Sequence, residues 1–251
     1  SIGLVGSEMC IRDSDISGYG EAPEMMKKKS YDLLIQAESG LIDVSGSPEG
    51  IGRIGVSICD IGAGMAANAG IVESLLLRER FHKVKDVKIS LFDVAADWMT
   101  VPYIHSKYGG AAPKRVGLKH PSIAPYGAFL SSESTSFIIS IQNELEWGRF
   151  CLDVLKTPTL AKDNKFSSNT LRVKNRDLLD ETVQSILISL TDETVKNRLE
   201  EASIAYGRLN SVKDLERHLA LKKINVRNSL DDILTIPSPP LIWDNSEQKA
   251  P

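Results

Sequence analysis

The sequence predicts an α/β protein in which a parallel sheet is joined by crossover helices. An apolar run typical of a strand, residues 54–58, precedes a helical pattern at about residues 61–78. A second strand-like segment, residues 86–92, alternates apolar and polar side chains and precedes another helical pattern at residues 93–103. The order strand, helix, strand, helix indicates parallel strands with a helix between them.

The segments before this core are shorter. Residues 1–14 match no expected element and lack the basic start and long apolar stretch of a signal peptide, so we interpret them as a non-native tail. Residues 31–39 are predicted to form a helix that ends at Gly40, with Leu33, Leu34 and Ala37 facing inward. Residues 45–52 hold three glycines and a proline and are expected to form a loop.

The composition changes near residues 108–113, and we place a domain boundary there. We expect a large domain over residues 15–112 and a smaller α+β domain over residues 113–215. A segment that returns to the large domain is expected over residues 216–245, followed by a disordered tail over residues 246–251.

Within the smaller domain the sequence predicts a strand at residues 136–141 and a helix capped by Asn143. Further helices are expected at residues 176–190 and 193–206, the second ending at Gly207, and another is expected to start at Ser211. The apolar face of the first helix is expected to be core and consists of Trp147, Phe150, Cys151, Val154 and Leu155.

Composition narrows the possible partners and compartment. The chain has 251 residues, and its net charge of −3 gives no basic surface for nucleic acid or an anionic membrane, so we expect neither partner. No apolar run approaches the roughly 20 residues that a membrane span needs. Cys10, Cys59 and Cys151 are widely spaced, which suits the reducing cytoplasm. No clustered His and Cys spacing indicates a metal site.

The segment around Asp60 is the strongest candidate for chemistry. Residues 53–70 read RIGVSICDIGAGMAANAG, which places a carboxylate between the predicted strand and a helix of small residues. The unpaired N–H groups at a helix start stabilise an anion there. Asp60 is therefore either a helix N-cap or a nucleophile that attacks an activated acyl group and carries it as a mixed anhydride. We interpret the neighbouring Cys59 as a small buried residue.

A third interpretation is a dinucleotide site. Residues 62–67 fit the pattern G-x-G-x-x-A, in which glycines let a pyrophosphate approach a helix start. The pattern also requires an acid about 20 residues later, at the end of the next strand. Asp86 comes before that strand and Asp93 lies too far along. A carboxylate directly before the turn would also repel the pyrophosphate.

Three segments resemble the family III CoA-transferases, the group that includes formyl-CoA transferase and carnitine CoA-transferase. They are residues 29–40 (KSYDLLIQAESG), 55–64 (GVSICDIGAG) and 87–93 (VKISLFD), in the family's order and spacing. In that family the acid of the motif I-x-D-x-x-x-G is the nucleophile, which here is Asp60. The resemblance covers residues 15–245. It implies a partial Rossmann-like parallel-sheet domain and a smaller α+β domain in an interlocked homodimer, with the family's N-terminal part missing from this chain.

The same resemblance assigns site residues. Lys29, Ser30, Tyr31 and Asp32 match the Lys-x-Tyr-Asp/Glu segment that contacts CoA and borders the nucleophile, and Asp32 is expected to orient its neighbours by hydrogen bonds. The backbone N–H groups of Gly62 and Gly64 are expected to hold the oxyanion.

The substrate assignment depends on a narrower resemblance. Residues 120–129 read HPSIAPYGAF, a form similar to a subgroup that moves CoA among C4 and C5 dicarboxylates, although the glycine-rich loop of formyl-CoA transferase is absent. His120 and Ser122 are expected either to bind a substrate carboxylate or to be structural. The implied function is CoA transfer from a dicarboxylyl-CoA such as succinyl-CoA to a carboxylic acid, with CoA as a substrate and no resident cofactor. An NAD(P)-binding protein and a non-catalytic truncated fragment remain alternatives.

Overall fold

The computed structural model of the chain describes residues 14–83 and 85–241. The chain divides into two compact units, unit 1 (residues 1–127) and unit 2 (residues 128–251), and the division falls inside strand β5, Tyr126–Leu130. The tail expected at residues 246–251 lies outside the described residues. So does the tail expected at residues 1–14, apart from Ser14, which begins the first strand. The domain boundaries expected from the sequence remain predictions.

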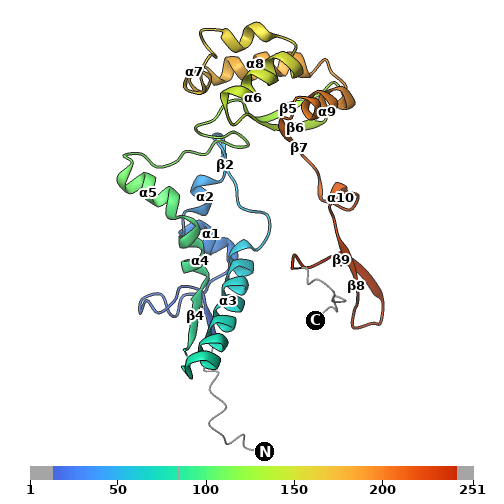
Figure 1. Cartoon of the computed structure of the whole chain (residues 1–251). Coiled ribbons are helices and arrows are strands. Elements are labelled where there is room, and N and C mark those ends of the chain that lie inside the picture. The colour runs from blue at the N-terminus through green and yellow to red at the C-terminus, as the bar shows by residue number, and fades with distance from the viewer. Residues whose placement is uncertain (1–13, 84, 242–251) are drawn as a thin grey trace, which may run out of the picture. The chain divides into compact units, whose positions relative to one another are not determined.

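Unit 1 contains a small parallel sheet and one long helix (Figure 1). Strand β1, Ser14–Ser17, pairs in parallel with β4, Val87–Ser90, and α3, Ile58–Phe81, leads from the preceding loop toward β4 and packs on it. This arrangement confirms a small parallel sheet with a helix packed on it, but the strand beside β4 is β1 and not the expected strand at residues 54–58. The remaining elements of unit 1 are α1 (Asp32–Glu38), α2 (Leu41–Val44), β2 (Gly46–Ser47), β3 (Gly50–Ile51), α4 (Leu91–Trp98) and α5 (Thr100–Tyr108).

Local signals explain where the helices around the sheet begin and end. The N-terminus of α4 is capped by Ser90, whose hydroxyl oxygen accepts the N–H of Asp93 at 2.9 Å. Helix α1 ends before Gly40, whose φ of 87° is the left-handed conformation that favours glycine. The helices enclose a small core of Tyr19, Ile35, Leu41, Cys59 and Ala95, so Cys59 is a buried residue as expected.

Two expectations for this unit are wrong. Residues 54–58 form no strand, and α3 already begins at Ile58. The backbone of Ile54 is bound by a side chain of α1 instead of by a neighbouring strand. The inward face of α1 consists of Asp32, Ile35 and Gln36, because the buried surroundings supply partners for both polar side chains. The three residues expected to face inward, Leu33, Leu34 and Ala37, are exposed.

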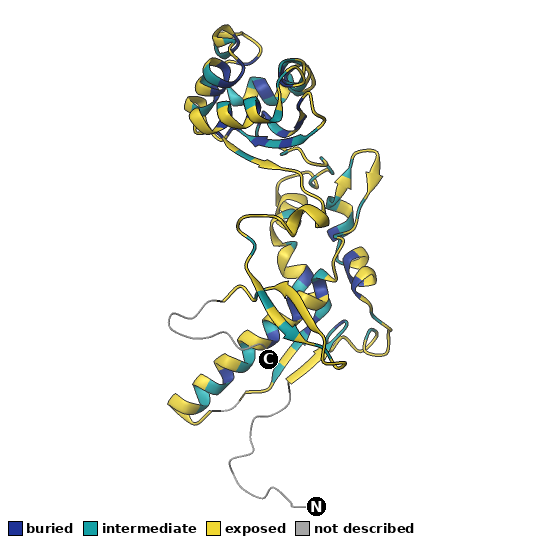
Figure 2. Cartoon of the chain, turned by 90° about the vertical axis from the view of Figure 1, so that its right-hand side faces the viewer, coloured by how far each residue is buried: buried dark blue, intermediate teal, exposed yellow. Residues whose placement is uncertain are grey.

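Unit 2 is a three-stranded sheet covered by helices. The sheet has the order β5–β6–β7, and β6 (Ser136–Ser140) runs antiparallel to β7 (Ala205–Arg208). The helices are α6 (Glu144–Arg149), α7 (Asn169–Lys174), α8 (Arg176–Leu187) and α9 (Asp192–Glu201), with a π-helical turn at Phe150–Val154 and a 3₁₀ turn at Pro158–Lys162. The side chains expected in its core are all buried: Trp147, Phe150, Cys151, Val154 and Leu155. Figure 2 colours the chain by burial, with buried positions in dark blue.

The helix boundaries of unit 2 were predicted with mixed success. Asn143 caps α6 by accepting the N–H of Glu146, as expected. Gly207 does not end a helix: α9 stops at Glu201, and Gly207 lies in β7 opposite Ile138. Pairing with a strand distant in sequence decided this segment, which a local pattern does not reveal.

After β7 the chain forms small elements of its own. Ser211 starts α10 (Val212–Leu215) through a capping box with Asp214, as predicted. Strands β8 (Lys223–Arg227) and β9 (Ile233–Pro237) then form an antiparallel hairpin, in which every residue of β9 is exposed.

Candidate active site

Asp60 lies in the first turn of α3 with its side chain exposed to solvent. The N-cap position belongs to Ser57, so the interpretation of Asp60 as the N-cap is wrong. Among the residues that the structure describes, the Asp60 carboxylate has neither an ion-pair partner nor a side-chain hydrogen bond. The helix dipole favours a negative charge at this place. The position therefore holds an open carboxylate that no neighbouring side chain neutralises.

The opposite side of α3 is packed. Gly62 follows Asp60 by two residues, which turns it about 200° around the helix axis. A Cβ on Gly62 would lie 2.4 Å from Cη2 of Trp98 and 2.8 Å from Cγ1 of Val94. Gly64, one turn after Asp60 on the same side, would have nothing within 4 Å of such a Cβ. Packing on α4 thus leaves Asp60 beside an uncovered stretch of backbone.

Both glycines lie inside the helix rather than in a turn before it. Backbone N–H groups at such positions donate to carbonyl oxygens four residues earlier, so they are not free for a ligand in this conformation. The dinucleotide interpretation required glycines in a turn ahead of the helix start, and the observed position of α3 does not support it.

Asp32 connects α1 to the start of α3. Its side chain is only 8% exposed, and Oδ1 accepts the backbone N–H of Cys59 at 2.8 Å. The N–H of Cys59 is one of the donors that a helix start leaves without an intrahelical partner. Ser57, the N-cap residue of α3, forms no side-chain cap. Asp32 therefore caps the start of α3 from another helix.

Gln36 is a site residue that the sequence analysis missed. It is fully buried, its Nε2 donates to Oδ2 of Asp32 at 2.7 Å, and its Oε1 accepts the N–H of Ile54 at 3.0 Å. The available signal was the spacing of Asp32 and Gln36, four residues apart, which places two polar side chains on one face of a short helix. The apolar pattern of the neighbouring leucines concealed it.

Lys29, Ser30 and Tyr31 directly precede Asp32 and therefore lie at the end of α1 that meets α3. Lys29 is exposed, and the ring of Tyr31 is 68% exposed. Ser30 instead lies against the loop after β1, because a Cβ placed on Gly18 would be 2.0 Å from its Oγ. Two of these three side chains are thus available to a ligand near the start of α3.

His120 and Ser122 lie together in the loop that precedes β5. Nδ1 of His120 accepts the backbone N–H of Ser122 at 3.2 Å, and the His120 ring stacks on Tyr126 with centroids 5.3 Å apart. These contacts hold the loop locally. The use of this pair as ligands for a substrate carboxylate remains a prediction.

The thiol next to Asp60 is not a competing nucleophile. Burial raises the pKa of Cys59 to about 11, and the nearby Asp32 carboxylate acts in the same direction. The thiolate, which is the reactive form of cysteine, is therefore disfavoured at neutral pH.

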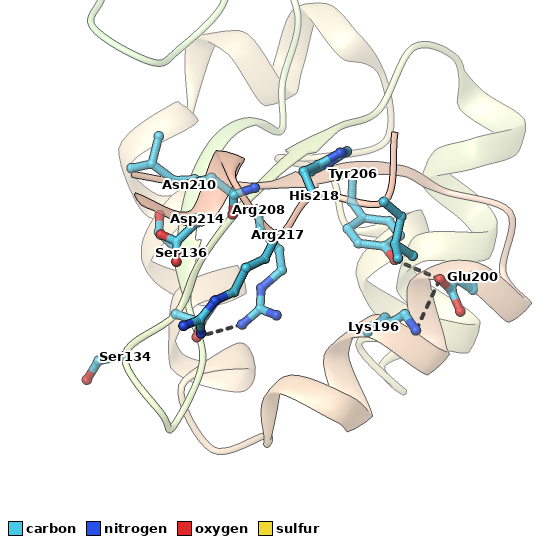
Figure 3. Close-up of a pocket in the computed structure, with 14 residues that line it drawn as sticks. Ser134, Ser136, Lys196, Glu200, Tyr206, Arg208, Asn210, Asp214, Arg217 and His218 are labelled. Carbon is cyan, nitrogen blue, oxygen red and sulfur yellow. Dashed lines mark hydrogen bonds and ion pairs between the residues drawn. The ribbon is translucent and has the colours of Figure 1, made fainter. Parts of the chain in front are cut away.

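Unit 2 has an open cavity of about 1130 Å³, drawn in Figure 3. Two of its cations meet acids: Lys196 lies 3.8 Å from Glu200, which also accepts the hydroxyl of Tyr206 at 2.8 Å, and Arg208 pairs with Asp192 at 2.8 Å. We assign no ligand to this cavity.

The part of the chain that the structure describes contains no group of three or more His, Cys, Asp or Glu side chains placed to hold a metal ion. None of its described helices is long and apolar enough to cross a membrane. Together the fold and the open acid define an α/β protein with a carboxylate as its candidate reactive group.

Comparisons with known proteins identify the family. The model of CoA-transferase family III matches residues 14–250, and the chain belongs to this family. Acetyl-CoA:oxalate CoA-transferase of Acetobacter aceti is 31% identical over 175 residues, which are 68% of this chain and 44% of that protein. Succinyl-CoA:glutarate CoA-transferase of Mus musculus is 31% identical over 204 residues, which are 80% of this chain and 46% of that protein.

A solved structure supports the fold. A CAIB/BAIF family protein from Brucella suis superposes with a TM-score of 0.78 at 26% identity, covering 93% of this chain and 61% of that one. The chain spans about half the length of the curated relatives it matches.

Proposed function

We propose that the protein transfers CoA between an acyl-CoA and a carboxylic acid, with Asp60 as the nucleophile. The observation that carries this proposal is the exposed, unpaired carboxylate at the start of α3 in a chain of CoA-transferase family III. A surface acid in a first helical turn is common, but this one stands where the family motif has its acid and where α1 holds the helix start from a buried position.

The proposed chemistry uses the carboxylate twice. An oxygen of Asp60 attacks the thioester carbonyl, the C–S bond breaks, and CoA leaves as the thiolate, which gives an acyl-aspartyl anhydride. The thiolate then attacks the Asp60 carbonyl carbon, the anhydride C–O bond breaks, and the first acid leaves as its carboxylate. An incoming carboxylate repeats these steps in reverse. A carboxylate suits the role because its anhydride stays activated toward both partners.

The protein groups near the nucleophile support binding of CoA. Lys29 offers an ammonium group for a phosphate and Tyr31 an exposed ring or hydroxyl, while Ser30 and Asp32 order the same segment. For the oxyanion the sequence predicts the N–H groups of Gly62 and Gly64, which lie beyond the first turn of α3. Because the N–H groups of Ile58, Cys59 and Ile61 in that turn already have acceptors, we propose that the dipole at the start of α3 stabilises the oxyanion.

For the substrate we propose dicarboxylic acids and their CoA esters, succinyl-CoA among them. Relatives are named as succinyl-CoA:glutarate, succinyl-CoA–D-citramalate and succinyl-CoA:mesaconate CoA-transferases, at 22–31% identity. His120 and Ser122 are the proposed ligands of the distal carboxylate, because an imidazole and a hydroxyl both hydrogen-bond to carboxylates. We further propose that the protein is a homodimer in the cytoplasm. It acts on small molecules and not on nucleic acid or membrane.

The test is direct detection of the covalent intermediate. The chain is incubated with succinyl-CoA, trapped with hydroxylamine, and the peptide that carries Asp60 is analysed by mass spectrometry. We expect a hydroxamate on Asp60 in the wild type and none in Asp60→Asn, with deamidation excluded. Asp97→Asn, which removes another exposed acid of unit 1, should label as the wild type does. Labelling that persists in Asp60→Asn would remove the assignment.

The alternative is that this chain is not catalytic by itself. Its basis is that the chain covers less than half the length of these two relatives. Size-exclusion chromatography with light scattering and a CoA-binding titration distinguish the two. A soluble dimer that binds CoA and labels at Asp60 supports a catalytic chain. A chain that neither binds CoA nor labels supports the non-catalytic alternative.

A further inference from the structure

Four residues form one hydrogen-bonded chain that ends at Cys59, the residue before Asp60: Ile54, Gln36, Asp32 and Cys59. The backbone N–H of Ile54 donates to Oε1 of Gln36 at 3.0 Å, and Nε2 of Gln36 donates to the Ile54 carbonyl at 3.3 Å. The same Nε2 donates to Oδ2 of Asp32 at 2.7 Å, and Oδ1 of Asp32 accepts the N–H of Cys59 at 2.8 Å. One turn of α1 therefore holds both ends of residues 54–59.

The buried amide of Gln36 is fully committed to this arrangement. Its two N–H bonds and its oxygen all have partners, and its side chain is 0% exposed. Residues 54–57 belong to no strand or helix, so regular secondary structure does not fix their path. A satisfied buried network of this kind specifies one geometry, whereas loss of one partner leaves several buried groups unsatisfied.

We propose that Gln36 is a positioning residue for Asp60. It fixes the entry of the chain into α3 at Ile54 and orients Asp32 toward Cys59, and thereby sets the direction in which the neighbouring Asp60 carboxylate leaves the helix. This inference rests on the proposed function of Asp60 as the nucleophile. Gln36 touches no substrate in this arrangement and acts through Asp32 and the backbone.

Unit 2 supplies a matched control. Gln184 of α8 clamps the backbone of Leu130 in the same way: its Oε1 accepts the Leu130 N–H at 2.9 Å and its Nε2 donates to the Leu130 carbonyl at 2.9 Å. Gln184→Met removes a comparable clamp without a link to α3. Gln36→Met should lower kcat for CoA transfer by about 100-fold, the effect of a misplaced reacting group, with KM for succinyl-CoA changed less than about two-fold. Gln184→Met should leave both constants within about two-fold of the wild type.

A charge swap separates positioning from simple loss of packing. Gln36→Glu places a carboxylate against Asp32, and Asp32→Asn places an amide donor against that of Gln36, so each single variant should lose activity. In the double variant Asp32→Asn/Gln36→Glu the new amide at position 32 donates to the new carboxylate at position 36, which still accepts the Ile54 N–H. We expect the double variant to recover at least about ten-fold in kcat over Gln36→Glu.

Amide hydrogen exchange of Ile54 and Cys59, measured by NMR, tests the clamp without any turnover. Both amides should lose protection in Gln36→Met and keep it in Gln184→Met. If the wild type forms no acyl-Asp60, the proposed function fails while the exchange result still decides whether Gln36 holds the helix start. If the wild type is active and Gln36→Met matches Gln184→Met in kcat, or if the double variant shows no recovery, the positioning role is overturned.

Discussion

The carboxylate of Asp32 accepts the backbone N–H of Cys59 at 2.8 Å, although 27 residues separate them. This one hydrogen bond joins two of the three segments that carry the family resemblance, the Lys-x-Tyr-Asp segment and the I-x-D-x-x-x-G motif. It gives an acceptor to the N–H of Cys59, which the start of α3 would otherwise leave unsatisfied. The pairing therefore gives a physical reason for both motifs to be present in one protein.

Removal of that acceptor should destabilise unit 1. Asp32→Ala leaves the N–H of Cys59 and one N–H of Gln36 without partners in a buried place. Each such group costs about 1–3 kcal/mol, so we expect a loss of at least about 2 kcal/mol in urea unfolding followed by circular dichroism. Asp43→Ala, at an exposed position of α2 whose side chain pairs with Arg115, is the control and should change stability by less than about 0.5 kcal/mol. Equal effects of the two changes would contradict the capping role.

The two glycines after Asp60 should respond oppositely to alanine. A Cβ at Gly62 would lie 2.4 Å from the Trp98 ring, so Gly62→Ala forces the ring or the helix to shift and should cost about 1–3 kcal/mol. Gly64→Ala meets open space and should stabilise α3 by about 0.5–1 kcal/mol, because alanine favours a helix over glycine. Thermal unfolding of both variants measures this contrast. Stabilisation by both substitutions would show that α4 does not pack on Gly62 as described.

The described thiols should be unreactive in the folded protein. Burial raises the pKa of Cys59 to about 11 and that of Cys151 to about 12, so both remain protonated at pH 8. Iodoacetamide followed by peptide mass spectrometry should find neither residue modified until urea unfolds the chain.

The same shifts give a pH dependence of stability. Thiols titrate near pH 8.5 in the unfolded chain and well above it in the folded chain. Above pH 8.5 the folded state therefore keeps more protons bound than the unfolded state does, and stability falls as the pH rises. The contribution of these thiols is complete below about pH 8.5 and is lost above it. Cys151→Ala should therefore show a flatter decline in stability between pH 8 and 10 than the wild type.

In unit 2 the pair Glu144 and Arg172 should contribute to stability in an acid-sensitive way. The guanidinium of Arg172 is 1% exposed and binds both carboxylate oxygens of Glu144, at 2.8 and 3.1 Å. Glu144→Gln should cost about 1–2 kcal/mol, because it removes a charge-assisted bond but leaves Arg172 with the Phe166 carbonyl and the Trp147 ring. Glu200→Gln, at an exposed ion pair with Lys196, should cost less than about 0.5 kcal/mol.

The hydrogen bonds from Arg172 hold the pKa of Glu144 below its usual value. Since the folded pKa is lowered, the contribution is present above the unfolded value of about 4.3 and is lost as the pH falls through the lower folded value. The wild type should lose stability more steeply below pH 4 than Glu144→Gln does. Parallel pH profiles of the two proteins would contradict this account.

Local signals in the sequence determined much of this protein. The alternation at residues 87–90, the caps at Asn143 and Ser211, and the glycine after α1 each act within a few residues, so they could be interpreted without the fold. The order of motifs also indicated the family, and it placed Asp60 at the start of a helix.

The tertiary structure alone decided which groups surround that acid. The segment at 54–58 looks like a strand but finds no partner strand, and the buried amide of Gln36 binds Ile54 instead. Gly207 looks like a helix end but pairs with β6. In each case the deciding hydrogen bond joins residues far apart in sequence, and no local pattern encodes which distant partner a backbone group will meet.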